Sequence, residues 1–137
     1  MPKTEPRAGW RIAPGVPESL ENVPGHAAVA GIARFRLFDG FFPPGEISHC
    51  AVHVVSERFT PSDGWRYTHP HVHDCGEVNF ILSDSGVLRF RYEVDGSTRI
   101  VESPSTVFLP AGTTHRMEAI GGTGLFLCMH LRERTPR

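Results

Sequence analysis

The sequence has 137 residues and a mass of 15.2 kDa, about the length at which a chain forms one domain around one core. Hydrophobic residues make up 39% and charged residues 21%, with a formal net charge of -1, so a broad electrostatic surface for nucleic acid or anionic membrane is not expected. The expected partner is a small molecule.

The three cysteines, Cys50, Cys75 and Cys128, are far apart and form no CxxC pair, which suggests neither a disulfide framework nor a thiolate zinc site. The first residues, MPKTEPRAGWRI, lack the apolar core of a signal peptide, and no apolar run is long enough to span a bilayer. We therefore expect a cytoplasmic protein with no membrane partner.

Residues 1–31 are rich in proline and glycine, which disfavours both a continuous helix and a regular β ladder. An irregular N-terminal arm is predicted over this range. The apolar residues Trp10, Ile12, Val16 and Leu20 leave two possibilities open. The arm is either a disordered tail or a segment that lies over the domain or over a partner subunit.

From residue 33 onward, short runs rich in β-branched and aromatic residues alternate with Gly, Pro, Asp and Ser, a pattern typical of consecutive strands and turns. The runs cover residues 33–38, 50–59, 77–82, 87–94, 98–102, 106–110, 115–120 and 125–131. Eight strands of this kind suit a β-sandwich or barrel. We predict an all-β domain over residues 32–132, followed by a tail at 133–137.

The run VLRFRYEV shows the alternation expected of a half-buried strand, with Leu88, Phe90 and Tyr92 on one face and arginines on the other. The dipeptide Asp95-Gly96 follows this run and precedes the next one. Both residues tolerate the positive φ of a tight hairpin turn. We therefore predict that the two runs pair as antiparallel neighbours.

Possible metal-binding side chains gather in the stretch THPHVHDCGE, where His71 and His73 are two residues apart. On a strand they would project from the same face and could converge on one ion. Glu77 follows a bend in the chain, so its carboxylate could bind the same ion. His115, in FLPAGTTHRM, begins a later strand that could lie beside the first. Imidazole and carboxylate ligands suit Fe(II), Mn, Ni or Zn.

The stretch HVHDCGE fits the motif HxHxxxE, and PAGTTH fits PxGxxH in the expected order, so the chain resembles the cupins over residues 58–131. The resemblance implies a jelly-roll β-barrel in which His71, His73, Glu77 and His115 hold one divalent transition metal. Fe(II) is the favoured ion, with Zn, Mn or Ni as alternatives. Because cupins commonly dimerise, a homodimer to which residues 1–31 contribute is also expected.

Other roles remain open for these residues. Glu77 could act as a base or contact the substrate while three histidines alone hold the metal. His69 forms a competing HPH pair with His71, but Glu77 then falls out of register with that pair, so we expect at most a supporting role for His69. His130, on the last predicted strand, is expected to be structural rather than catalytic.

Several further residues are candidates for the pocket. Asn79 shares the strand face of Glu77 and should point into the barrel near the metal, where it could bind substrate. His53 and Trp65 are the other substrate-binding candidates, although His53 suits a structural role better than a catalytic one. Trp65 and Tyr67 precede the first motif, at the expected mouth of the barrel. Tyr67 could act as a catalytic acid or base if metal or burial lowered its pKa.

Four protein ligands leave about two open positions on an octahedral ion, which suits an oxygen-bearing metabolite or a substrate together with dioxygen. The prediction is a metal-dependent enzyme acting on a small carboxylate, keto, enol or phenolic compound. Fe(II)-dependent oxygenation, an oxidoreductase reaction of the dioxygenase type, is the favoured chemistry. One alternative is a redox-neutral lyase or isomerase in which Glu77 or Tyr67 moves a proton. The other is a cupin that binds a small ligand without turning it over.

Overall fold

Alternation of apolar and polar residues gives this chain strands with one buried face. The computed structural model describes residues 12–37 and 47–131, and the described part of the chain contains no α-helix. The elements are β1 (Val16–Glu18), a 3-10 turn η1 (Leu20–Asn22), β2 (Ile32–Leu37), β3 (Ile47–Val55), β4 (Gly76–Leu82), β5 (Arg89–Val94), β6 (Ser97–Glu102), β7 (Ser105–Leu109), β8 (His115–Gly121) and β9 (Gly124–Leu131). No helix in the described residues is long and apolar enough to cross a membrane.

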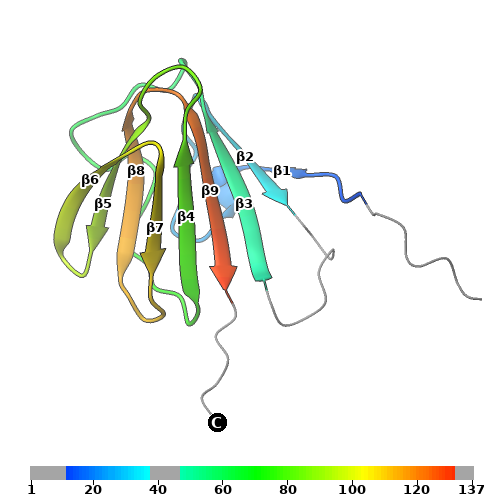
Figure 1. The fold of residues 1–137 in the computed structure, drawn as a ribbon, viewed down its shortest axis with the longest axis vertical. Helices are drawn as coiled ribbons and strands as arrows, with labels where there is room; N and C mark the ends of the chain where they lie inside the picture. The colour runs from blue at the N-terminus through cyan, green and yellow to red at the C-terminus, as the bar shows by residue number, and fades with distance from the viewer. Residues whose placement is uncertain (1–11, 38–46, 132–137) are drawn as a thin grey trace, which may run out of the picture.

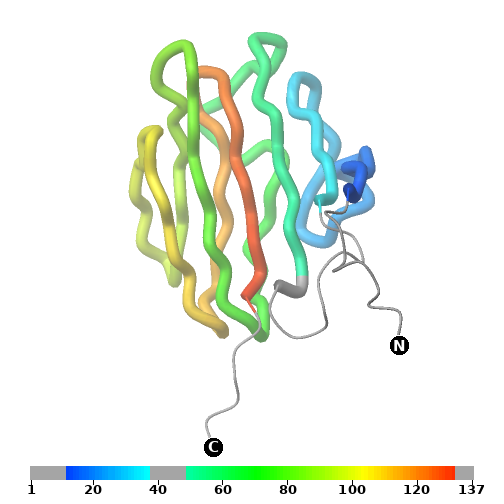
Figure 2. The backbone as a smooth tube through the Cα atoms, turned by 45° about the vertical axis from the view of Figure 1, so that its right-hand side comes forward, coloured from blue at the N-terminus to red at the C-terminus, as the bar shows by residue number. Residues whose placement is uncertain are grey.

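The strands form two antiparallel sheets (Figure 1). The larger sheet has the order β1-β2-β3-β9-β4-β7, and the smaller has the order β6-β5-β8. Figure 2 shows the smaller sheet lying behind the larger one, so that the two enclose a common interior. The all-β prediction is confirmed.

The eight predicted runs correspond in order to strands β2 to β9. The largest difference concerns residues 50–59, because β3 begins at Ile47 and ends at Val55. The chain turns there: the Ser56 N–H donates to the Gly31 carbonyl, and the Phe59 N–H donates to the Ser56 carbonyl. Residue 38 of the first run, residues 1–11 of the arm and the predicted tail at 133–137 lie outside the described residues.

The predicted hairpin between β5 and β6 is present. Asp95 has a φ of 48° and Gly96 a φ of 84°, the positive values that a two-residue hairpin turn of this kind requires. The flanking residues Val94 and Ser97 face each other as the first antiparallel pair. The antiparallel pairing predicted for these two runs is confirmed.

The core lies between the two sheets. Phe90 of β5 and Phe126 of β9 stack with ring centroids 4.7 Å apart, which joins the smaller sheet to the larger one. Leu88 and Tyr92 are also buried, at 0% and 2% exposure, so the predicted buried face is confirmed. Each large apolar side chain buried in this way contributes about 1.5–3 kcal/mol to folding.

Residues 12–31, the described part of the predicted arm, pack against their own chain. β1 forms a three-residue antiparallel pairing with β2, and Leu20 of η1 is buried in the core. Further along, the Ala27 N–H donates to the Tyr67 carbonyl, and the His69 N–H donates to the Gly25 carbonyl. The segment therefore lies beside the residues that lead into the first histidine motif.

Candidate metal centre

The chain before the first histidine motif is an extended segment held in place by a buried carboxylate. Glu118 of β8 is 2% exposed and accepts hydrogen bonds from three successive backbone N–H groups, those of Arg66, Tyr67 and Thr68, at 2.8, 2.6 and 2.9 Å. Charge-assisted bonds of this kind are stronger than neutral ones. Glu118 therefore fixes the path of the chain toward the histidines.

The two motifs meet through one isolated antiparallel bridge. The His71 N–H donates to the His115 carbonyl at 2.9 Å, and the His115 N–H donates to the His71 carbonyl at 2.8 Å. His71 and His73 were predicted to lie on a strand, whereas the described segment makes isolated bridges only, this one and a second between Thr68 and His26. The predicted juxtaposition of the His115 segment with the His71 segment is nevertheless present.

Imidazole and carboxylate groups converge beside this bridge. Two sets, His71/His73/His115 and His73/Glu77/His130, each have their possible ligand atoms within 4.8 Å of one another. One oxygen of Glu77, Oε1, lies 3.5 Å from His73 Nε2, 3.7 Å from His115 Nε2 and 3.1 Å from His130 Nε2. Ligands bound at about 2.1 Å in octahedral or tetrahedral geometry lie about 3.0–3.5 Å apart. The cluster could therefore hold a metal ion with little rearrangement.

Backbone carbonyls set which ring nitrogen of two histidines faces the cluster. His71 Nδ1 lies 2.8 Å from the His69 carbonyl, and His115 Nδ1 lies 2.9 Å from the Thr113 carbonyl. A carbonyl can only accept, so in the neutral ring each Nδ1 carries the proton and each Nε2 keeps a lone pair. Among the described residues, the buried Nε2 of His115 has no hydrogen-bond partner. A metal ion at the cluster would supply that partner.

Buried amide and phenol groups hold Glu77 in place. The Asn79 amide donates to Glu77 Oε2 at 3.0 Å, and the Tyr92 hydroxyl donates to Asn79 Oδ1 at 2.9 Å. Burial by itself raises the pKa of Glu77, but His115, His130 and the Asn79 amide together outweigh it and hold the pKa well below its usual range. Glu77 is therefore a carboxylate at neutral pH.

The histidines of the cluster differ in their acid–base properties. Burial lowers the pKa of His71, and burial together with the neighbouring His130 lowers the pKa of His73 to about 4. Burial also acts to lower the pKa of His115, but the Glu77 carboxylate raises it by more, so the net shift is upward. His71 and His73 are therefore neutral at pH 7, which is the form that binds metal.

His71, His73, Glu77 and His130 of the cluster line a cavity of about 480 Å³. Besides the cluster, three further histidines line it: His26 of the N-terminal segment and His49 and His53 of β3. His53, a predicted substrate-binding residue, is 3% exposed and faces this cavity. Asn79, the second such residue, is 0% exposed and reaches the site through its bond to Glu77.

The structure places Tyr67 and Trp65 away from this cavity. Tyr67 is 1% exposed, and its hydroxyl accepts a hydrogen bond from the Ala119 N–H. Burial raises the pKa of Tyr67, opposite to the shift that a catalytic acid or base would need. Trp65 lies between the guanidinium groups of Arg91 and Arg116, 4.4 and 4.1 Å from its ring centroid. Neither residue stands at the mouth of the histidine cavity.

Two further histidines lie near the site, His69 just before the first motif and His130 on β9. The side chain of His69 is exposed, and the residue contributes its backbone carbonyl to the orientation of His71. His130, which was expected to be structural rather than catalytic, bonds Glu77 and also belongs to the second group of possible ligands. Its alternation with Phe126 and Cys128 indicated an inward-facing side chain, but the sequence offered no sign of its proximity to Glu77.

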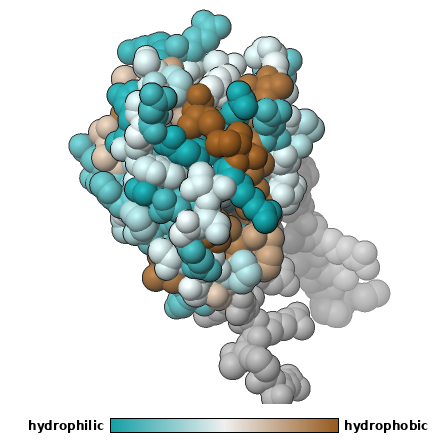
Figure 3. Space-filling view, turned by 90° about the vertical axis from the view of Figure 1, so that its left-hand side faces the viewer, coloured by the Kyte–Doolittle hydropathy of each residue, from teal (hydrophilic) through white to brown (hydrophobic). Residues whose placement is uncertain are grey.

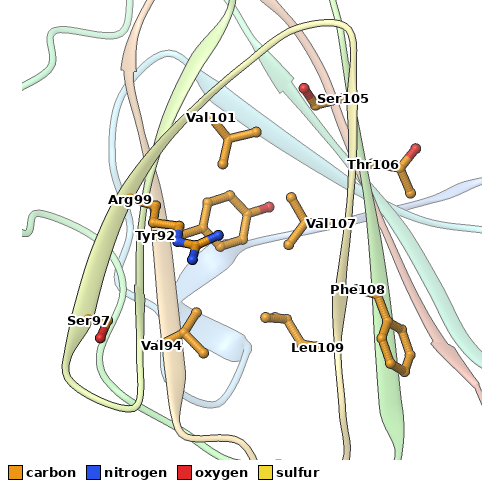
Figure 4. A pocket seen from close by; sticks show the side chains of 10 residues that line it. All are labelled: Tyr92, Val94, Ser97, Arg99, Val101, Ser105, Thr106, Val107, Phe108 and Leu109. Atoms are coloured by element: carbon orange, nitrogen blue, oxygen red, sulfur yellow. The ribbon is translucent and has the colours of Figure 1, made fainter.

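A second cavity of about 550 Å³ opens between the edge strands β6 and β7. Figure 3 shows apolar side chains on the corresponding side of the molecule. In Figure 4, Val94, Val101, Val107 and Leu109 point into the cavity around the ring of Tyr92. None of the residues lining it is a histidine, cysteine, aspartate or glutamate, whereas possible metal ligands line the cavity of about 480 Å³.

No family model and no curated protein matches the chain. Solved structures do match. The polyketide cyclase RemF from Streptomyces resistomycificus is 20% identical, with 94% of this chain and 83% of that chain covered and a TM-score of 0.58. KdgF from Halomonas sp. is 17% identical, with 77% and 83% covered and a TM-score of 0.54. A cupin superfamily protein from Desulfitobacterium hafniense is 13% identical, with 78% and 83% covered and the same TM-score.

These similarities, together with the two antiparallel sheets and the two histidine motifs, show that the chain has the cupin fold. The fold predicted from the motifs is confirmed. The particular chemistry of the chain depends on its own site, because proteins that share a fold carry out many different reactions.

Proposed function

We propose that the protein is a metal-dependent enzyme acting on a small oxygen-bearing metabolite. The observation that carries the proposal is the convergence of His71, His73, His115 and Glu77, with the buried Nε2 of His115 pointing into the cluster without a partner among the described residues. One divalent transition metal per chain is the expected cofactor. Fe(II) is favoured, and Zn, Mn or Ni suit the same donors.

The residues around the ion have separate roles. His71, His73 and His115 bind through Nε2, and the carbonyls of His69 and Thr113 hold two of the rings in orientation. A divalent ion held here would act as a Lewis acid toward a substrate oxygen. Glu77 either completes the ligand set or accepts a proton from the substrate. Its two oxygens are oriented by His130 and by Asn79.

Two reaction classes fit this site. Oxygenation with Fe(II) is the class that the sequence favours. A redox-neutral lyase, isomerase or cyclase reaction is the second candidate, supported by the additional imidazoles of His26, His49 and His53 in the cavity. The similar fold of a polyketide cyclase is consistent with it. Oxygen consumption by the metal-loaded protein during a metabolite screen would select the first class, and product formation without it would select the second.

Metal binding is the first test. Untagged protein titrated with Fe(II), Zn²⁺, Mn²⁺ and Ni²⁺ should bind about one equivalent of at least one ion. His71→Ala, His73→Ala and His115→Ala should each weaken binding by at least about tenfold, because each removes a lone pair from the cluster. Calorimetry and elemental analysis would measure both effects.

His69→Ala is the matched control, since its exposed side chain lies in the same motif and its backbone carbonyl is kept. It should bind metal as the unchanged protein does. If His69→Ala emptied the site while His73→Ala did not, the assignment of ligands would be wrong. If the protein bound less than about a tenth of an equivalent of metal under every loading condition, the proposal of a metal-dependent enzyme would be wrong.

A further inference from the structure

One buried arginine in the histidine cavity is not explained by metal binding. Arg34 of β2 is 6% exposed and lines the same cavity as the cluster. Arginine is rarely buried to this extent unless its charge is paired. The one acidic side chain bonded to Arg34 among the described residues is Glu18, whose Oε1 accepts from Nε at 2.9 Å. Glu18 also bonds Arg36 through its other oxygen, at 3.0 Å.

The two terminal nitrogens of Arg34 point toward imidazoles rather than carboxylates. Nη1 donates to His53 Nε2 at 2.9 Å, and Nη2 donates to His49 Nε2 at 3.0 Å. Burial, followed for His53 by the charge of Arg34, lowers the pKa of both histidines, to about 4 for His49. Both rings are therefore neutral at pH 7. They orient the guanidinium group but do not offset its charge.

The guanidinium group of Arg34 has N–H donors that the described residues do not use. A guanidinium group has five N–H donors. Within the described residues, Glu18, His49 and His53 occupy three of the five donors of Arg34. Two therefore remain for a ligand in the cavity. An oriented, buried cation with unused donors is the kind of group that recognises a carboxylate.

Arg34 and the histidine cluster line the same cavity, where one small molecule could contact both. The ring of His49, which accepts from Arg34, lies 4.8 Å from the ring of His130. On the other side, His26 lies 5.8 Å from His53 and 5.9 Å from His71. One or two layers of imidazole rings thus separate the guanidinium group from the cluster, within a cavity of about 480 Å³.

We infer that Arg34 binds the carboxylate of the substrate, so that the cavity takes a small organic monocarboxylate. The other end of that molecule, carrying a hydroxyl or carbonyl oxygen, lies at the histidine cluster. The inference rests on the proposed function only for this second contact. A phosphate ester suits the cavity less well, because its larger negative charge would face Glu18, Asp74 and Glu77, which line the same cavity.

Matched pairs of probes test the recognition of the carboxylate. Calorimetry on the full chain, metal-free and zinc-loaded, would compare 3-hydroxybutanoate with 3-hydroxybutanamide, and salicylate with salicylamide. At least one carboxylate should bind more tightly than its amide, by about tenfold or more. Arg34→Gln should remove this preference, because its neutral side chain no longer pairs with the charge. Inorganic phosphate is the third probe and should bind more weakly than the preferred carboxylate.

Glu18→Gln separates this role from a purely structural one. If Arg34 serves only as the ion-pair partner of Glu18, the two variants should have the same effect on carboxylate binding. If Arg34 recognises the carboxylate, the effects should have opposite signs. Glu18→Gln removes a competing anion and should tighten carboxylate binding by about threefold. This variant also keeps the test decisive if Arg34→Gln does not fold.

Several outcomes would overturn the inference: carboxylates binding no better than amides, phosphate binding more tightly than either, or Glu18→Gln weakening carboxylate binding as much as Arg34→Gln does. A parallel Zn²⁺ titration keeps the two proposals apart. If the chain binds zinc but shows no preference for carboxylates, the metal proposal is supported and the proposed role of Arg34 is wrong. If the chain prefers carboxylates but binds no metal, the role of Arg34 is supported and the metal proposal is wrong.

Discussion

At the scale of single residues, Glu77 is the one acidic member of the two possible ligand sets. One of its oxygens lies near three imidazoles, and the other accepts from Asn79, which is held in turn by Tyr92. A carboxylate in this position can serve as a ligand or as a base. These roles differ in whether the charge itself is needed during turnover.

Glu77→Gln distinguishes the two roles. The amide keeps the shape of the side chain and one oxygen, so the variant should fold and retain metal affinity within about tenfold, while kcat on a substrate found by a metabolite screen falls by about a hundredfold or more. Steady-state kinetics beside metal titration would measure this. Glu102→Gln, an exposed partner of Arg89, should change neither quantity. Full turnover by Glu77→Gln, or tight ligand binding without product, would favour the non-catalytic alternative.

At the scale of structural elements, the site depends on an extended segment that is not itself part of a sheet. Residues 66–68 are bound to Glu118 of β8, and residues 67 and 69 are bound to the N-terminal segment at Ala27 and Gly25. The packing is close, because a Cβ atom added at Gly25 would lie 3.0 Å from His71 Nδ1. Two elements distant in sequence thus position His71.

Glu118→Gln should loosen this segment. An amide cannot accept at both of its terminal atoms, so at least one of the three N–H groups loses its partner, at a cost of about 1–3 kcal/mol in the free energy of unfolding. Denaturant unfolding would measure the loss, and metal affinity should fall with it because His71 shifts. Glu93→Gln is the matched control. It breaks a partly exposed ion pair with Arg116 and should cost less than about 1 kcal/mol.

At the scale of the whole molecule, the outer face of the six-stranded sheet is apolar, whereas an antiparallel sheet exposed to water usually carries polar residues there. Side chains facing away from the core align across neighbouring strands in three rows: Phe35, Val52, Leu127 and Phe80; Val54, Leu125 and Leu82; Met129, Val78 and Phe108. Phe108, Leu82 and Leu125 are 58%, 45% and 39% exposed. Contiguous apolar surface of this kind is typical of an interface.

We expect a homodimer that buries this outer face. The double variant Phe108→Glu, Leu125→Glu should be monomeric, because two carboxylates per chain would have to lose their hydration in the interface. Light scattering would measure the mass. Ile100→Glu, at an equally exposed apolar residue of the other sheet, should leave the dimer intact. A monomeric unchanged protein, or a dimeric double variant, would contradict the expectation. The contribution of residues 1–31 to a dimer stays a prediction.

Features that depend on neighbouring residues could be determined from the sequence alone. The alternation of Leu88, Phe90 and Tyr92 identified a buried face, and Asp95-Gly96 identified the hairpin, because side-chain period and turn geometry are local properties. Motif spacing likewise indicated the cupin fold. It also selected the four residues that the structure brings together, although their role as ligands remains a proposal.

Features that depend on strand register were decided only by the tertiary structure. His130 lies opposite Glu77, and His53 lies opposite Arg34, because β9 pairs with β4 and β3 pairs with β2 in one particular alignment. The structure places Tyr67 and Trp65 outside the lining of the histidine cavity for a related reason. The backbone N–H of Tyr67 is bonded to the buried Glu118, and the ring of Trp65 lies between Arg91 and Arg116. Such contacts join residues about 20 to 50 positions apart, and no local pattern in the chain records them.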